Sequence, residues 1–332
     1  LDPACGSSGF LVFTINYYRN LVKKQKGWVD EKSNPLDDVD LTSDQREILR
    51  GKIKEYAGVH IKGIDFDNDL TKVAKMYMVM VDDGHTCIWT SNSLIPFDEL
   101  TKNTRSTITK EGIDIIMTNP PFGSKGKVED PNILSGYDFG YSWKKDKKTG
   151  KFNKEKLLAG KKGGGQVPDI LFIERCMSLL KKGGRMGIVL PDGDLTNQNT
   201  EFVRAWLKDK AQIIAVVSLP QETFVPFGAG VKSSVLFLKK PKGKLSERYP
   251  IFFANLIKIG YDIRGRKTYK RNEKGEVIDY EKRPIVYLTD RKGNKTKQDP
   301  SLVELKGALD TDVPNVLNEW VKFKKEFKSY IW

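Results

Sequence analysis

The residues of this sequence best suited to chemistry are Asn119, Pro120, Pro121 and Phe122, which follow a short apolar run at positions 113–117. Such a run, flanked by a charged, Gly-containing turn, is typical of a buried parallel strand. Pro120 keeps Asn119 out of the helical region, and both prolines have a fixed φ and no N–H. The side-chain oxygen of Asn119 and the carbonyl of Pro120 are therefore free acceptors beside the ring of Phe122. This combination suits a planar ligand that carries an exocyclic amine.

The chemistry of such a ligand explains the residue types. An aromatic amine is a poor nucleophile because its lone pair is delocalised into the ring. Acceptors bonded to its hydrogens favour a more tetrahedral nitrogen and stabilise the positive charge that develops as it attacks. Amide and carbonyl oxygens do this without removing a proton first, so catalysis is largely positioning and electrostatics. Taken alone, the same four residues also fit a proline-stiffened turn after a strand.

An Asn-Pro-Pro-Phe motif after an apolar strand resembles the catalytic motif of the adenine-N6 DNA methyltransferases. The resemblance implies that Asn119 and Pro120 bind the amine of a target adenine, with Pro121 completing the motif. It also implies that Phe122 stacks on the base after the base has been flipped out of the duplex. Flipping is required because a duplex hides the amine from the pocket.

The first eleven residues form a second motif, a Gly-rich turn between a strand end and an apolar helix. Glycines let the backbone approach a ligand, and a helix N-terminus presents free N–H groups. A plain strand-to-helix connection is the alternative. Together with Asn-Pro-Pro-Phe, the turn resembles the S-adenosylmethionine-binding motif of the same family, with Asp2 facing the methionine moiety and residues 6–9 beneath the cofactor. The family usually has glycine where Ser8 stands.

Two further positions fit the same cofactor. Asp65 ends a predicted second strand at residues 59–64 and is placed to accept ribose hydroxyls, with Phe66 beside the adenine ring. Asn92 follows a predicted third strand at residues 86–89, where the family commonly has Asp. A helix N-cap is the other role for an acid here, and it suits Asp67 better than Asp65. The full set assigned to the cofactor is Asp2, Ala4, Gly6, Ser8, Gly9, Asp65, Phe66, Asn92 and Asn119.

Strands and helices alternate along the chain, which predicts an α/β fold with right-handed crossovers and a mostly parallel sheet. The final strands, 213–219 and 233–238, are close enough for an antiparallel hairpin at one edge. The resemblance implies the Rossmann-like fold of the S-adenosylmethionine-dependent methyltransferases. Little precedes the Gly-rich turn, so the first strand is largely missing from this sequence. We therefore expect residues 1–11 to be poorly fixed in a molecule that begins at Leu1, and cofactor binding by it to be weak.

Residues 123–167 form a long Gly- and Lys-rich segment directly after the catalytic motif. Loops of this length are usually functional or mobile. Its basic runs, at residues 144–148 and 161–165, predict either contact with DNA phosphates or a solvated flexible loop. We predict a catalytic domain at residues 1–240 and a basic extension at residues 241–332. The extension resembles the part of type I modification subunits that meets the specificity subunit.

The composition is basic, with a formal net charge of +14 and a pI near 9.4, which fits binding to a polyanion. No apolar run approaches membrane-spanning length, so we expect no membrane association. The three cysteines, Cys5, Cys87 and Cys176, are scattered in the sequence, which suggests a reducing cytoplasm and no metal site.

The sequence as a whole resembles the modification subunit of a type I restriction–modification system. The resemblance implies S-adenosylmethionine as the cofactor, no metal, and DNA as the substrate. The implied partners are a specificity subunit and, in the full restriction assembly, a restriction/translocase subunit. Two alternatives stay open. One is the methyltransferase part of a single-chain restriction enzyme. The other is a degenerate DNA-binding scaffold, which the departures at Ser8 and Asn92 support.

Overall fold

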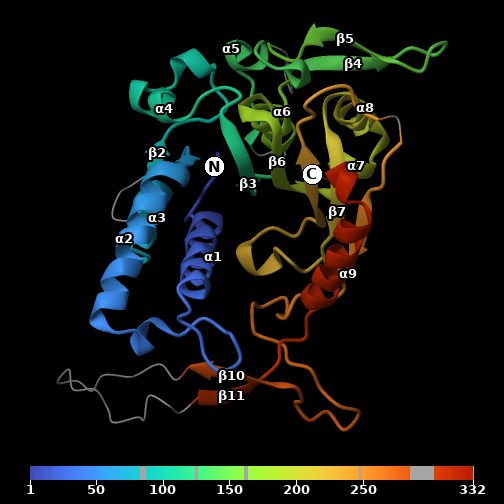
Figure 1. Cartoon of the computed structure of the whole chain (residues 1–332). Helices are drawn as coiled ribbons and strands as arrows, with labels where there is room; N and C mark the ends of the chain where they lie inside the picture. Colours follow the sequence, from blue (N-terminus) through green and yellow to red (C-terminus); the bar gives the residue numbers. More distant parts are fainter. Residues whose placement is uncertain (83–86, 124–125, 161–163, 247, 285–302, 332) are drawn as a thin grey trace. The chain divides into compact units, whose positions relative to one another are not determined.

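The structure is a computed structural model that describes residues 1–82, 87–123, 126–160, 164–246, 248–284 and 303–331 (Figure 1). Of residues 281–284 and 303–306 only the backbone is described. The chain forms two compact units. Unit 1 consists of Leu1–Val216 and Ser234–Ile251, and unit 2 of Val217–Ser233 and Phe252–Trp332. The predicted boundary between residues 240 and 241 stays a prediction.

Unit 1 contains a sheet that is parallel over most of its width. Strand β1 (Gly63–Asp65) pairs in parallel with β2 (Ile88–Thr90), and β3 (Ile113–Thr118) pairs in parallel with β6 (Leu180–Pro191). Beyond β6 the order continues through β8 (Ser233–Lys239) to β7 (Gln212–Ser218). Strand β8 is antiparallel to β6, because Gly183 and Gly184 near the start of β6 exchange hydrogen bonds of 2.8 Å with Lys240 just after β8. The predicted α/β fold with a mixed, mostly parallel sheet is confirmed.

Leu1 and Asp2 lie between β1 and β3 and join the two parts of this sheet. On one side, the Met117 N–H donates to the Leu1 carbonyl at 3.2 Å. On the other, the Asp2 N–H donates to the Lys62 carbonyl, and the Ile64 N–H donates to the Asp2 carbonyl, both at 2.9 Å. Residues 1–11 are thus held by the sheet and by the helix that follows. Leu1 and Asp2 thus continue both ladders, and how firmly residues 1–11 are fixed stays a prediction.

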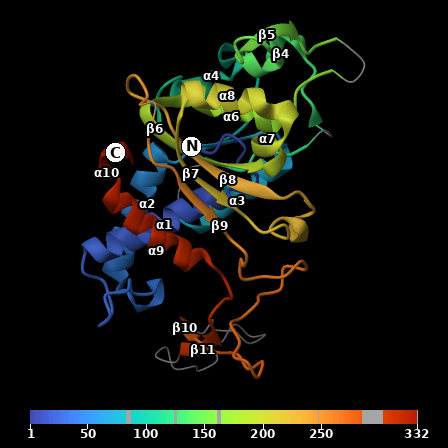
Figure 2. The same ribbon diagram turned by 90° about the vertical axis from the view of Figure 1, so that its right-hand side faces the viewer.

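Two apolar clusters pack the helices of unit 1. The first joins α1 (Gly9–Gln25), α2 (Ser43–His60) and α3 (Asn68–Met80) to β2 through residues such as Ile15, Ile53, Met78 and Ile88. The second joins α6 (Pro168–Leu179) and α8 (Glu201–Lys210) to β3, β6 and β8. Figure 2 shows β6, β8 and β7 side by side with α6 and α8 along them. The other helices of unit 1 are short: α4 (Lys102–Thr107), α5 (Pro131–Leu134) and α7 (Asp192–Thr196).

The predicted strand at residues 59–64 is wrong over its first half, because α2 continues to His60 and β1 begins at Gly63. Thr42 starts α2 with a reciprocal cap, in which its side chain accepts from the Gln45 N–H and the Gln45 side chain accepts from the Thr42 N–H. Leu49, Ile53 and Ala57 then form one buried stripe. This stripe extends the helix through residues whose β-branched types favoured a strand. The predicted third strand is observed at Ile88–Thr90; Thr86 lies outside the described residues.

The long loop predicted at residues 123–167 is wrong for most of its length. After α5, a single turn of 3-10 helix (Asp138–Gly140) leads into an antiparallel hairpin of β4 (Tyr141–Lys145) and β5 (Phe152–Leu157). Figure 1 shows this hairpin projecting from unit 1. The basic run at residues 144–148 lies at its tip, whereas residues 161–163 lie outside the described part of the chain.

Unit 2 contains β9 (Phe252–Asn255), the antiparallel pair β10 (Tyr280–Pro284) and β11 (Val303–Gly307), and the helices α9 (Val313–Glu326) and α10 (Lys328–Ile331). Strand β9 and α9 pack through the rings of Phe252, Trp320 and Phe323. The sequence predicts a helix at residues 313–327, and α9 confirms it. Among all the helices that the structure describes, none is long and apolar enough to cross a membrane.

Candidate active site

The predicted site residues all lie in unit 1, where neighbouring strands end. Asp65 is the last residue of β1, Asn92 follows β2, and Asn119 follows β3. Asp2 lies between β1 and β3 and starts the Gly-rich loop. Since these strands are parallel, their carboxyl ends meet at one edge of the sheet, where ligands of open α/β sheets bind. The fold therefore brings the two motifs together.

Asp65 holds the Gly-rich loop in place. One of its carboxylate oxygens accepts the Gly6 N–H at 2.7 Å, and the other accepts the Asp67 N–H at 2.9 Å. Gly6 has a φ of +50°, which favours glycine. A Cβ at Gly6 or at Gly9 would meet nothing within 4 Å, so open space lies beside the loop. Each carboxylate oxygen has a second lone pair, so Asp65 retains acceptors for a ligand.

Asp2 is buried, with 2% of its surface exposed, and one carboxylate oxygen accepts the Ala4 N–H at 3.1 Å. Burial raises the pKa of Asp2 to about 7, because desolvation penalises the charged form. The Ala4 amide and the nearby Thr118 hydroxyl oppose this shift only in part. A positively charged group placed against Asp2 would favour the carboxylate, so the position suits a ligand ammonium.

Ser8 has a φ of +70°, in the left-handed region, where it precedes the first residue of α1, Gly9. This conformation explains why glycine is favoured at the position, since an L-residue with a Cβ pays roughly 1–2 kcal/mol there. The side chain of Ser8 is fully buried. It therefore lies away from the open space beside Gly6 and Gly9.

Phe66 and Asn92 occupy the outer part of this edge. The Phe66 side chain is 76% exposed at the end of β1, so its ring is accessible to a flat ligand. Asn92 is half-buried, and its side-chain oxygen accepts the Leu94 N–H at 2.9 Å. The adjacent Ser93 hydroxyl donates to the Pro3 carbonyl and ties this turn to the Gly-rich loop. Sequence reasoning did not identify Ser93.

The Asn-Pro-Pro-Phe motif, which we predict to be catalytic, lies directly after β3. Asn119 and Pro121 are exposed, Pro120 is buried and Phe122 is half-buried. Asn119 is thus an exposed residue at the strand end, next to a buried proline. This arrangement leaves the acceptor that the chemistry requires accessible to a ligand.

Asp169, near the start of α6, is a residue to which the sequence analysis assigns no role. Its carboxylate accepts the Gly123 N–H, directly after Phe122, at 3.3 Å, and the Ile170 N–H at 2.9 Å. Gly123 has a φ of +88°. Asp169 is 2% exposed, and burial raises its pKa above the usual range. In the sequence, an acid directly after Pro168 was the only hint of this role. Its hydrogen-bond partner, Gly123, is 46 residues away, so no local pattern connects the two.

A second buried acid, Asp194, lies near Asp169 at the start of α7. One of its carboxylate oxygens is buried without a hydrogen-bond partner among the residues that the structure describes. Burial, reinforced by the charge of Asp169, raises the pKa of Asp194 to about 7. The carboxylate of Asp169 thus adds to the effect of burial on Asp194.

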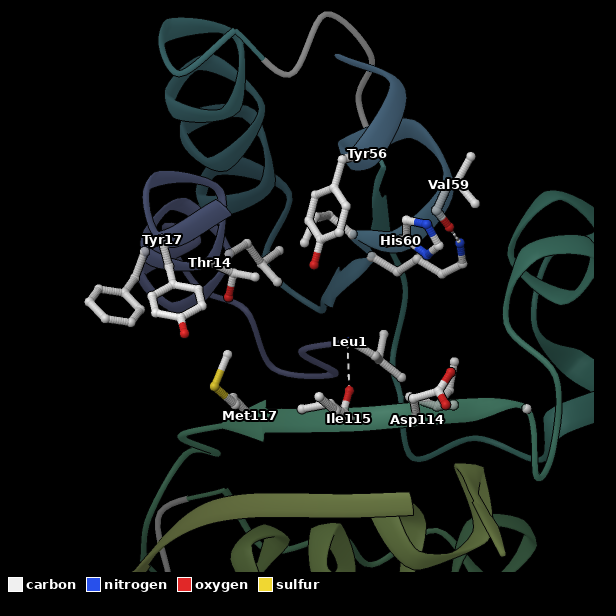
Figure 3. Close-up of a pocket in the computed structure, with 15 residues that line it drawn as sticks. Leu1, Thr14, Tyr17, Tyr56, Val59, His60, Asp114, Ile115 and Met117 are labelled. Atoms are coloured by element: carbon white, nitrogen blue, oxygen red, sulfur yellow. Dashed lines mark hydrogen bonds between the residues drawn. The ribbon is translucent and has the colours of Figure 1, made fainter. Parts of the chain in front are cut away.

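A cavity of about 610 Å³ in unit 1 lies apart from this edge (Figure 3). It is lined by the start of β3, by α1 residues such as Thr14 and Tyr17, and by Tyr56 and His60 at the end of α2. Most of the β3 residues that line it precede the carboxyl end of the strand. None of the predicted site residues lines it, and we assign it no part in the chemistry. The described residues include no group of three or more His, Cys, Asp or Glu that could hold a metal.

The strand order, the Gly-rich loop beside β1 and the Asn-Pro-Pro-Phe loop after β3 define a Rossmann-like methyltransferase fold. A solved structure shares it: a nuclease-deletion mutant of the type ISP restriction–modification enzyme LlaGI, in complex with a DNA substrate mimic. The two superpose with a TM-score of 0.50 at 14% sequence identity, over 76% of this chain and 21% of that one.

Residues 1–283 match the family model described as N-6 DNA Methylase, and the chain belongs to this family. The methylase subunit of the type I restriction enzyme EcoEI from Escherichia coli is 24% identical over 250 residues, which are 72% of this chain and 37% of that protein. The StySPI methylase subunit from Salmonella potsdam is 25% identical over 246 residues, 72% of this chain and 35% of that protein. The chain thus spans little more than a third of the length of these relatives.

Proposed function

We propose that this chain is the catalytic part of an adenine-specific DNA methyltransferase, the methylation subunit of a type I restriction–modification enzyme. The observation that carries the proposal is the exposed Asn119 amide, held at the end of β3 by the buried Pro120. Family membership and the two methylase-subunit relatives support the same reaction class.

S-adenosylmethionine fits the residues at this edge and, when bound, supplies a methyl group on a positively charged sulfur. Asp2 would face its methionine ammonium, Asp65 would accept from its ribose hydroxyls, and the exposed ring of Phe66 would pack against its adenine. The open space beside Gly6 and Gly9 leaves room for it. Asn92 accepts from the adenine amino group through the oxygen that now accepts the Leu94 N–H, since that oxygen has a second lone pair.

The catalytic loop acts on the target base. The Asn119 side-chain oxygen and the Pro120 carbonyl accept the two hydrogens of the adenine amine and orient its nitrogen toward the methyl group. Phe122 stacks on the flipped base, a contact worth about 1–3 kcal/mol. No residue removes a proton before attack, and the chain's contribution is positioning and electrostatic stabilisation.

The proposed partners follow from the type I relatives. DNA is the substrate, a specificity subunit contacts residues 241–332, and a restriction/translocase subunit joins the full assembly. The reaction takes place in the cytoplasm. A scaffold that only binds DNA would not need an accessible Asn119 amide, which is why we favour the enzyme.

The test uses the complete natural protein with its copurifying subunits, duplex DNA and S-adenosylmethionine carrying a labelled methyl group. Mass spectrometry of the digested nucleosides should find the label in N6-methyladenine. The matched control is the same complex with Asn119→Ala. Label in cytosine, or no label with a wild-type complex that binds both DNA and cofactor, would overturn the proposal.

A further inference from the structure

We propose that the β4–β5 hairpin is a DNA-binding arm, whose tip lysines contact backbone phosphates of the DNA that carries the target base. The proposal rests on the proposed function for the identity of the DNA and goes beyond it in assigning a binding element. The four lysines concerned, which we call the tip lysines, are Lys144, Lys147, Lys148 and Lys151.

The arm is rooted beside the catalytic loop. Val128 and Gln166 close its base with two backbone hydrogen bonds of 2.8 and 3.0 Å. The Gln166 side chain also donates to the Phe139 carbonyl at 2.8 Å inside the core. Three residues after Gln166, Asp169 accepts the Gly123 N–H that ends the catalytic loop. The segment therefore leaves and rejoins unit 1 next to the residues that hold the target base.

The inner face of the arm is fixed to α8. Trp143 stacks on Phe202 with ring centroids 6.1 Å apart. Lys154 pairs with Asp138 at 3.0 Å, and Asp138 also accepts the Trp206 indole N–H at 3.0 Å. Lys145 pairs with Glu201 at the first residue of α8. The lysines on this side are thus neutralised by acids and hold the arm in one orientation.

The tip lysines differ from Lys145 and Lys154. All four are exposed, and none has an acidic partner among the described residues. Asp146, the acid within the tip, is engaged by the turn itself. One of its carboxylate oxygens accepts the backbone N–H groups of Lys148 and Thr149 at 2.9 and 2.7 Å, and the Thr149 hydroxyl at 3.0 Å. The turn is therefore ordered while its positive charges stay in solvent.

A polyanion is the occupant that this surface fits. Residues 144–151 consist of lysines, Asp146, Thr149 and Gly150, so the tip offers no apolar side chain. Protein interfaces have an apolar core within a polar rim, which the tip lacks. Lysines that neutralise phosphates release condensed counterions, and this supplies affinity without sequence preference. That role suits an enzyme in which readout of the DNA sequence belongs to another subunit.

The test compares three variants of the complete protein with its copurifying subunits. The first carries Lys147→Gln, Lys148→Gln and Lys151→Gln, and a second replaces the same lysines by Arg. The matched control carries Lys24→Gln, Lys26→Gln and Lys54→Gln, which remove the same charge from exposed positions elsewhere. Lys24 is on α1, Lys26 directly follows α1, and Lys54 is on α2. Binding to a duplex of fixed length is measured from low to physiological salt, with thermal melting as the check on folding.

The Gln variant should weaken binding about 10–100-fold near 0.1 M salt and reduce the slope of log K against log salt by about 2–3, since each lost phosphate contact removes about 0.9. The Arg variant should bind as wild type does, and the control should change affinity less than about two-fold. If the slope of log K against log salt is the same in the Gln variant as in the wild type, the hairpin is not a DNA-binding arm. This conclusion does not depend on which base the wild type methylates. A loss of subunit assembly with unchanged DNA affinity also overturns the arm, since it would make the tip a protein contact. If the wild-type complex does not methylate adenine, the proposed function is overturned. The salt dependence of DNA binding still tests whether the hairpin binds DNA.

Discussion

The Gly-rich loop and the Asn-Pro-Pro-Phe loop lie at the same edge of the sheet but are held in different ways. The Gly-rich loop is fastened by three side chains: Asp65 at the end of β1 accepts from Gly6, Asp2 accepts from Ala4, and Ser93 after β2 donates to Pro3. The catalytic loop keeps Asn119 in solvent, and its hydrogen bond to Asp169 lies beyond Phe122, at Gly123.

This difference separates two tasks. A cofactor site must offer a backbone already in shape, and hydrogen bonds to charged groups, each contributing about 1.5–3 kcal/mol, hold that shape. A site for a flipped base must instead keep its acceptors free until the base arrives. The same carboxylate of Asp65 serves the loop and, in our proposal, the ribose. Substitutions on the cofactor side should therefore affect affinity, and those on the catalytic side should affect the rate.

The largest expected effect is that of Asn119→Ala. Loss of the acceptor should lower kcat by about 1,000-fold, comparable to removal of one preorganised hydrogen-bonding group in other enzymes. Cofactor affinity should change less than about three-fold, because the amide acts on the target amine. Single-turnover methylation and calorimetry measure the two quantities. Asn103→Ala, at an exposed asparagine of α4, is the control. Activity of Asn119→Ala within a few-fold of wild type would remove this residue from catalysis.

The contrast between the loops also marks how far the sequence could predict the structure. The catalytic motif is local: an apolar run, two prolines and an aromatic suffice to place β3 and the exposed Asn119. The cap at Asp67 was predictable for the same reason, since its signal lies within one turn. Residues 59–61 were misassigned because the buried stripe of α2, which begins ten residues earlier at Leu49, outweighs local β-branched types.

Contacts between distant residues could not be predicted. Tyr141, Trp143 and Phe152 carried a weak alternating strand signal, but the lysines around them favoured a loop. The hairpin is stabilised by the stacking of Trp143 on Phe202 and by the hydrogen bond from the Trp206 indole N–H to Asp138. Phe202 and Trp206 lie on α8, far along the chain from the hairpin. Residues 1–11 were expected to be poorly fixed because the first strand is largely missing from the sequence. Their backbone hydrogen bonds join them to Lys62, Ile64 and Met117, which no local pattern identifies.

Asp65→Ala tests the cofactor side. It removes a charged hydrogen bond to Gly6 and the proposed ribose acceptor, so the cofactor Kd should rise about 10–100-fold. The rate of methyl transfer at saturating cofactor should fall much less. Asp67→Ala is a close control, because Asp67 caps α3 two residues away. That change should cost about 1 kcal/mol of stability and leave the Kd within two-fold. Equal effects of both substitutions on the Kd would refute a specific role for Asp65.

A smaller effect is expected from Asp169, which we assign as a positioning residue for the catalytic loop. Asp169→Ala should lower kcat about 10-fold without changing cofactor affinity, since one long hydrogen bond is lost. The ionised carboxylate is the stronger acceptor for Gly123. Because burial raises its pKa, wild-type kcat should fall on acidification at a pH above the ordinary range of an Asp. Asp169→Asn should retain most activity at neutral pH and flatten that acid limb. An unaltered pH profile in the Asn variant would contradict the assignment.

The smallest expected effect is that of Ser8→Gly, and it asks whether the departure at this position weakens the cofactor side. Glycine relieves a left-handed strain of roughly 1–2 kcal/mol, but it also gives the unfolded chain more freedom, worth about 0.4–1 kcal/mol. The melting temperature should therefore change little. The buried Ser8 side chain does not enter the open space beside Gly6 and Gly9, so cofactor affinity should change less than about three-fold. Calorimetry measures the cofactor Kd of the wild type and of Ser8→Gly. A gain of ten-fold or more would mean that Ser8 holds the loop too far from its ligand, and that the Gly-rich loop is less well prepared than its hydrogen bonds indicate.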